Sequence, residues 1–177
     1  MLLLERQLRL TPADHGTHRR LDFDVPPDCL ELRFDLAYAP KRLPAAESHE
    51  QATAALERQA RQLSGELDRT PLVDVWRNWW MQRLRAQPAF QLANLVTITL
   101  DDAAGSFRGA NHRHAAEQHL FVRADAASPG LTPGLLPAGT WTLTVSAHTL
   151  VTPTCVYSIQ IGAETASSPP LASRSSA

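Results

Sequence analysis

The stretch that decides the fold runs from Phe107 to His148 and reads FRGANHRHAAEQHLFVRADAASPGLTPGLLPAGTWTLTVSAH. Near its middle, three prolines alternate with three glycines between Pro129 and Gly139. Proline fixes φ and glycine widens the accessible backbone, so this segment predicts a shaped crossing between two elements and not a flexible linker. It leads into Trp141–His148, where apolar residues alternate with threonine, serine and histidine. That alternation is typical of a half-buried β-strand.

The same period of two recurs along most of the chain. It predicts strands over residues 2–10, 20–25, 30–38, 91–102, 107–109, 117–122, 141–148 and 155–161. The second and third of these strands are separated by a short turn, so we expect them to pair antiparallel. Their polar faces would then form exposed cross-strand ion pairs, with Asp22, Asp24 and Asp35 opposite Arg20 and Arg33.

Residues 48–85 depart from this pattern and predict two helices. Ser48 followed by Gln51 fits a capping box at a helix start, and Gly65 marks the region where this helix ends. Thr70 followed by Pro71 is a second start signal. Apolar residues recur at helical spacing after each start, which indicates a helical hairpin inserted between strands.

Together these patterns predict a mainly β protein. Seven or eight strands of this spacing favour a two-sheet antiparallel β-sandwich, jelly-roll-like, with an inserted α-helical hairpin. We expect one sandwich domain over residues 1–163, the helical insertion at 48–85, and a Ser/Pro/Ala-rich tail at 164–177.

Composition and charge narrow the class of protein. A formal net charge of −1 predicts no nucleic-acid partner, which would call for a basic face. The opening MLLLERQ holds three consecutive leucines before the first charge, too few for a signal peptide, and no later run is long enough to span a membrane. We therefore expect a cytoplasmic protein in which Cys29 and Cys155 are free thiols.

Several segments carry a resemblance to a known family, namely Phe23–Pro27, Leu32–Tyr38, Asn94–Val96, Phe107–His114 and Ala127–Thr142. Over residues 15–162 the chain resembles the N-terminal β-sandwich of CehA/McbA-type metallohydrolases, which precedes a PHP (polymerase and histidinol phosphatase) catalytic domain. The family's metal ligands belong to the PHP domain, and no D-x-H-x-H-x-x-x-S-D stretch occurs in this sequence. The resemblance thus implies a fold and an accessory role, with no catalytic residue. It implies as partner either a second copy or a separately encoded PHP-type metallohydrolase.

Histidines are concentrated around the predicted crossing. A candidate zinc site would use His112, His114, Glu117 and His119, because imidazole is a common transition-metal ligand. A candidate small-ligand site, for example for a carbohydrate, would use His112, His114, His119, Trp141 and His148. The alternative is that these histidines are ordinary hydrogen-bonding side chains and that the protein has no cofactor.

A metal-dependent hydrolase built on the histidine loop, or a triad of Ser146 or Ser106 with His148 and Asp101, is a further hypothesis. No G-x-S-x-G elbow accompanies those serines, so we assign no catalytic residue.

The second predicted helix carries three tryptophans, Trp76, Trp79 and Trp80. They could anchor the hairpin to the sandwich, because indoles bury large apolar areas. They could also form a partner interface, since tryptophan is enriched at interface hot spots. Adjacent residues on a helix point about 100° apart, so Trp79 and Trp80 cannot both face the same neighbour fully. A homodimer or a contact with another protein through the hairpin follows as an expectation.

Overall fold

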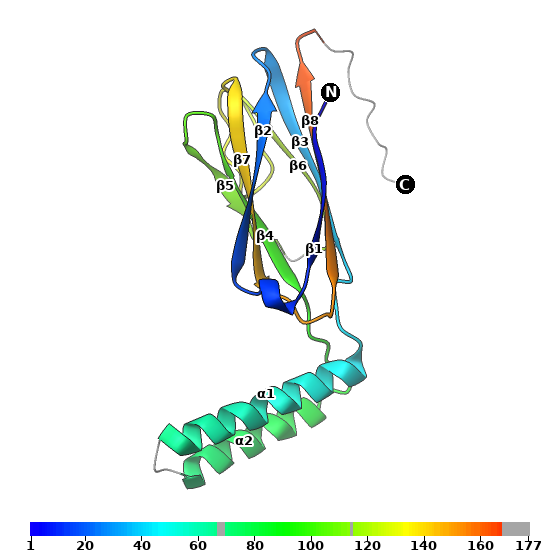
Figure 1. Ribbon diagram of the computed structural model, residues 1–177, viewed down its shortest axis with the longest axis vertical. Coiled ribbons are helices and arrows are strands. Elements are labelled where there is room, and N and C mark those ends of the chain that lie inside the picture. The colour runs from blue at the N-terminus through cyan, green and yellow to red at the C-terminus, as the bar shows by residue number, and fades with distance from the viewer. Residues whose placement is uncertain (67–69, 114, 168–177) are drawn as a thin grey trace. The chain divides into compact units, whose positions relative to one another are not determined.

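The computed structural model describes residues 1–66, 70–113 and 115–167. These residues form two compact units, a β-sandwich built from residues within 1–41 and 94–167, and a helical unit built from residues within 42–93 (Figure 1). The predicted β-sandwich with a helical insertion is confirmed, and the inserted unit is longer at both ends than residues 48–85.

The described part of the sandwich contains eight strands. In chain order they are β1 (Leu2–Leu10), β2 (Thr17–Val25), β3 (Cys29–Ala39), β4 (Leu95–Asp101), β5 (Phe107–Asn111), β6 (Glu117–Arg123), β7 (Gly139–Thr149) and β8 (Cys155–Thr165). A single 3-10 turn, Pro12–Asp14, joins β1 to β2. The helical unit contains α1 (Ala45–Glu66) and α2 (Thr70–Arg85), inserted between β3 and β4.

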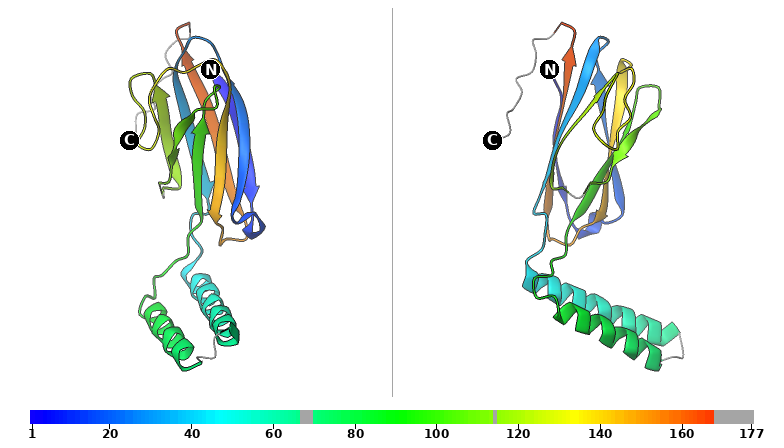
Figure 2. Two further views of the ribbon diagram at one scale, coloured as in Figure 1. Left: turned by 90° about the vertical axis from the view of Figure 1, so that its left-hand side faces the viewer. Right: turned by 180° about the vertical axis from the view of Figure 1, so that it is seen from behind.

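The strands pair in a nested order. One sheet runs β1-β8-β3-β6 and the other β2-β7-β4-β5, and all the pairs are antiparallel (Figure 2). The first strand thus pairs with the last, the second with the seventh, the third with the sixth and the fourth with the fifth. One long antiparallel ribbon folded over on itself produces this order, which is that of a jelly roll.

The expected pairing of the second and third strands is wrong. β2 lies in one sheet and β3 in the other, because the chain crosses between the sheets at Pro26 and Pro27. The acidic residues therefore have other partners. The hydroxyls of Thr142 and Thr140 on β7 donate to Asp22 and Asp24, each at 2.7 Å. Asp35 pairs with His119 on β6 and not with an arginine of β2.

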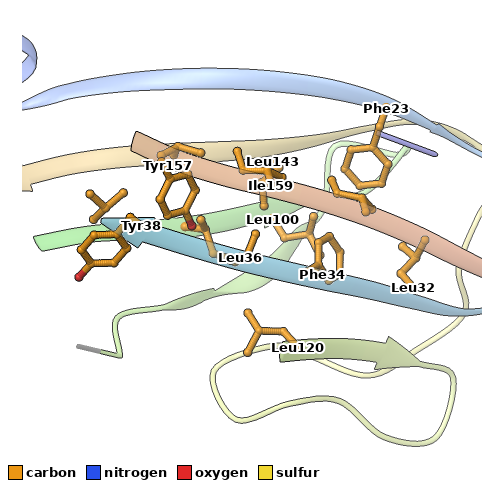
Figure 3. Packing of buried hydrophobic residues seen from close by; sticks show 14 of the residues in the cluster. Phe23, Leu32, Phe34, Leu36, Tyr38, Leu100, Leu120, Leu143, Tyr157 and Ile159 are labelled. Carbon is orange, nitrogen blue, oxygen red and sulfur yellow. The ribbon is translucent and has the colours of Figure 1, made fainter. Parts of the chain in front are cut away.

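The core lies between the two sheets (Figure 3). Inward positions of every long strand supply it, including the fully buried Trp141, Leu143 and Ile159. Phe23 of one sheet and Phe34 of the other meet edge to face, with ring centroids 6.2 Å apart, an arrangement that aromatic pairs favour. Cys29 and Cys155 are both free thiols, as expected.

A buried arginine holds the Pro/Gly crossing in shape. Nη1 of Arg108 donates to the carbonyl of Leu135 at 2.8 Å, and Nη2 donates to the carbonyls of Thr132 at 3.1 Å and Gly134 at 3.2 Å. Its guanidinium also lies over the Trp141 ring, 5.1 Å from the centroid, and Nη1 lies 3.5 Å from the carboxylate of Asp102. The crossing is therefore structurally specified.

Glycines in and beside this crossing occupy backbone conformations that other residues avoid. Gly134 has φ +147° and Gly139 has φ +123°, as the prediction of a shaped crossing requires. Gly109 on β5 has φ +112°, and its α-carbon faces the carbonyl of Gly130 so closely that a Cβ would lie 2.3 Å from that oxygen. The two backbone segments can approach this closely because Gly109 and Gly130 have no side chains.

The helical unit begins differently from its prediction. α1 starts at Ala45, so Ser48 lies inside the helix and is not its N-cap. Its fully buried hydroxyl donates to the carbonyl of Leu43 at 3.1 Å and accepts from the amide of Leu92 at 3.0 Å. Ser48 thus ties together the two ends of the insertion, a tertiary role that outweighs its capping preference. The second helix starts at Thr70, as predicted.

Candidate functional site

The helical unit has very little core of its own. α1 and α2 lie side by side and antiparallel (Figure 1), yet Ser48, Ala60 and Val73 are the only buried residues among the described side chains of the two helices. Large apolar side chains stay at the surface instead, with exposed fractions of 61% for Leu72, 67% for Val75, 49% for Trp79 and 42% for Trp80. Such an apolar concentration is characteristic of an interaction surface.

An apolar groove of about 520 Å³ runs along this unit. Its walls are Ala52, Ala55 and Leu56 from α1 and Trp76, Trp80 and Leu84 from α2, and Phe90 and Leu92 follow α2 in the chain. We call this the hairpin groove. Small alanines on α1 opposite indoles on α2 leave the space between the helices unfilled, which is why the groove forms.

The indole rings are held in defined positions. Trp79 and Trp80 meet edge to face with centroids 4.8 Å apart, and the guanidinium of Arg83 lies 4.8 Å from the Trp79 centroid. Trp76 and Trp80 line the hairpin groove, whereas Leu72, Val75 and Trp79 form an exposed ridge beside it on α2. Trp79 and Trp80 each remain about half exposed.

Polar residues occupy another side of the hairpin. A mainly polar depression is lined by Glu57 of α1 and by Arg77, Asn78, Met81, Gln82 and Arg85 of α2. Arg77 bridges the helices there, with its guanidinium 3.9 Å from Glu57 and 3.5 Å from Asp74. The hairpin is therefore amphipathic as a unit, with charge on one side and the hairpin groove and ridge on another.

The predicted histidine cluster is divided between the two sheets. His112 follows β5, and its ring lies 6.3 Å from that of His148 on β7, whose Nε2 is 2.8 Å from the hydroxyl of Thr97. His119 belongs to β6, where Nδ1 lies 2.5 Å from Asp35 and Nε2 lies 3.5 Å from Glu117. The hydrogen bond that His119 donates to the Asp35 carboxylate raises the pKa of His119 above its ordinary value.

The described members of the candidate zinc site do not gather in one place. Among the residues that the structure describes, no three histidine, cysteine or acidic side chains gather so that they could hold a metal ion. His112, Glu117 and His119 are among these residues, while His114 lies outside them.

In the candidate ligand site, Trp141 is not available as an aromatic surface for a ligand. Trp141 is fully buried, and its indole N–H donates to the carbonyl of Pro137 at 2.8 Å. Its ring is packed under Arg108, so it offers no free face to a sugar or another flat ligand. His112 and His148 remain together at the surface without it.

The structure pairs Ser146 with a histidine that the sequence did not suggest. Nδ1 of His18 on β2 lies 2.9 Å from the Ser146 hydroxyl on β7, while His148 bonds to Thr97. The hypothetical triad of Ser146, His148 and Asp101 therefore does not form. The pairing of Ser146 with His18 depends on the β2–β7 register, which places the two residues directly opposite each other.

Comparison with known proteins returned no match to a protein-family model, to a curated protein or to a solved structure. Neither described helix is long and apolar enough to cross a membrane.

Proposed function

We propose that this chain is a non-catalytic accessory domain that binds a protein partner through the hairpin groove. The observation that carries the proposal is the pair of half-exposed indoles, Trp79 and Trp80, on a helical unit with almost no core. Desolvating indoles is a common source of binding energy at protein interfaces. The resemblance to the N-terminal sandwich of CehA/McbA-type metallohydrolases, a domain without catalytic ligands, supports the accessory role.

The shape of the groove supports an amphipathic helix as its occupant. Two antiparallel helices with an open apolar seam are half of a helical bundle, and a further helix completes the core of such a unit. Most of the described residues that line the groove are apolar, Gln59 and Gln87 are uncharged, and Arg83 is the one ionised side chain among them. The occupant should therefore present leucine or aromatic side chains at helical spacing.

Site-specific photo-crosslinking in cells that produce the full chain tests this proposal. The photoreactive p-benzoylphenylalanine replaces Gln59, which lines the hairpin groove, or Gln82, which lines the polar depression. Both positions are exposed glutamines on helices, so they are matched controls. We expect Gln59→p-benzoylphenylalanine to yield adducts with a helical peptide and Gln82→p-benzoylphenylalanine to yield few. Equal yields at both positions, or no adduct at Gln59, would refute the proposal.

A further inference from the structure

We infer that the helix filling the hairpin groove is α2 of a second copy of this chain, packed antiparallel across a two-fold axis. This inference rests on the proposed function, and it names the partner. The two hairpins would form a four-helix bundle in which each copy supplies both a groove and a ridge. Three properties of the described residues lead to it, namely shape, charge and area.

The first property is self-complementary shape. The ridge of Leu72, Val75 and Trp79 stands on α2 directly beside the groove-lining Trp76 and Trp80. At about 100° per residue the ridge and groove positions cover one continuous arc of the helix. A two-fold axis beside α2 can therefore set the ridge of each copy into the groove of the other. An isologous interface requires this reciprocity.

The second property is charge. Residues 42–93 contain seven arginines and six carboxylates, so two helical units would not repel each other strongly. Arg83 is the one ionised side chain among the residues that line the described groove. Parallel packing would place the two Arg83 guanidinium groups side by side.

Antiparallel packing keeps those like charges apart. With an axis between Trp76 and Trp79, the two Arg83 positions lie about 16 Å apart along the helices, at about 1.5 Å per residue. At that separation their repulsion is screened by salt. Charge thus favours the antiparallel arrangement.

The third property is area. The 16 residues of α2 span about 24 Å, and two helices about 10 Å wide present roughly 480 Å² in projection. Accessible surface exceeds projected area, so the face approaches the roughly 800 Å² per partner of a standard interface. Each indole contributes about 100 Å² at its observed half exposure. The hairpin face is therefore large enough for a specific dimer.

The test measures the oligomeric state of the full chain by sedimentation velocity from about 1 to 100 µM. We expect a concentration-dependent dimer. Val75→Glu on the ridge should raise its dissociation constant at least about 30-fold, since a buried unpaired carboxylate is costly. Asn78→Glu places the same charge on the polar side of the hairpin and should change the dissociation constant of the dimer less than about 3-fold. Helical circular dichroism at 222 nm checks folding, and Leu72→Glu repeats the test at a second exposed ridge position.

Disulfide trapping tests the direction of packing. Leu72→Cys and Arg83→Cys chains are mixed in equal amounts and oxidised, and the linked peptides are identified by mass spectrometry. We expect 72–83 linkages between chains to dominate, because the proposed axis sets these positions opposite each other. A predominance of 72–72 linkages would overturn the antiparallel arrangement.

The outcomes separate this inference from the proposed function. A chain that stays monomeric to 100 µM, with Gln59 adducts that come from another protein, overturns the inference and leaves the proposed function standing. A monomer without groove-specific adducts, whose indoles are protected from acrylamide quenching, overturns both. A dimer that Val75→Glu and Asn78→Glu weaken equally also overturns the inference.

Discussion

Replacing Gly109 by alanine should destabilise the sandwich strongly. The added Cβ would lie 2.3 Å from the carbonyl oxygen of Gly130 and 2.8 Å from the α-carbon of Leu131, both backbone atoms. That backbone cannot retreat freely, because the Ala110 amide donates to the same Gly130 carbonyl at 2.9 Å. We assign about 1–3 kcal/mol to the φ of +112° and about 1–3 kcal/mol to the steric overlap, a loss of about 4 kcal/mol in unfolding free energy.

Gly105→Ala is the matched control. Gly105 also has a positive φ, +75°, but nothing lies within 4 Å of its added Cβ. It should cost only about 1–2 kcal/mol, the backbone part alone. Guanidinium unfolding followed through Trp141 fluorescence measures both, in a background where Trp76, Trp79 and Trp80 are phenylalanine. If Gly109→Ala costs no more than Gly105→Ala, the close contact with Gly130 does not constrain the fold as argued.

Two further predictions concern the sandwich. Because Asp35 raises the pKa of His119 in the folded state, the small stabilisation from this exposed pair should be present below pH 6.5, the ordinary value, and be lost as pH rises through the folded-state pKa. An NMR titration should find the His119 pKa above 6.5 and a lower value in Asp35→Asn, and an unchanged value in that variant would contradict the assignment. Replacing residues 43–92 by Asn-Gly should leave a folded sandwich, because Arg42 and Ala93 already pair as antiparallel neighbours suited to a two-residue turn. Loss of the β-sheet circular dichroism signal would show that the sandwich depends on the helical unit.

Strand positions were predictable from sequence, but strand partners were not. In β3 the alternation of Leu32, Phe34 and Leu36 with polar residues reports which side of the strand faces the core. It does not report which sheet holds the strand, since both sheets of a sandwich bury one face. β2 and β3 therefore had the pattern of a hairpin although the chain passes between sheets at Pro26 and Pro27. The nested order becomes visible only when all eight strands are paired.

The candidate site was predictable as a stripe of tryptophans but not as a groove. Helical spacing placed Trp76, Trp79 and Trp80 on one helix, whereas the groove also requires Ala52 and Ala55 of α1 at the opposite wall. The small side chains that create the space give no sequence signal of their own. Side-chain pairs between distant parts of the chain were equally hard to predict. The partner of Ser146 is His18, which lies 128 residues earlier and is identified by the β2–β7 register alone.

The point of insertion explains how the sandwich can carry a helical unit without losing its own order. Asn94, fully buried, donates its backbone amide to the carbonyl of Lys41 at 2.9 Å and its side-chain amide to that of Pro40 at 2.8 Å. Its side-chain oxygen accepts from Val151 at 2.8 Å in the β7–β8 turn. These hydrogen bonds join the chain just before residues 42–93 to the chain just after them, within the sandwich. Because β3 and β4 lie in different sheets, the insertion lies in a connection between the two sheets and interrupts no strand pair. None of the described helical residues belongs to the buried cluster between the sheets, and the proposed binding role accounts for their exposed apolar side chains.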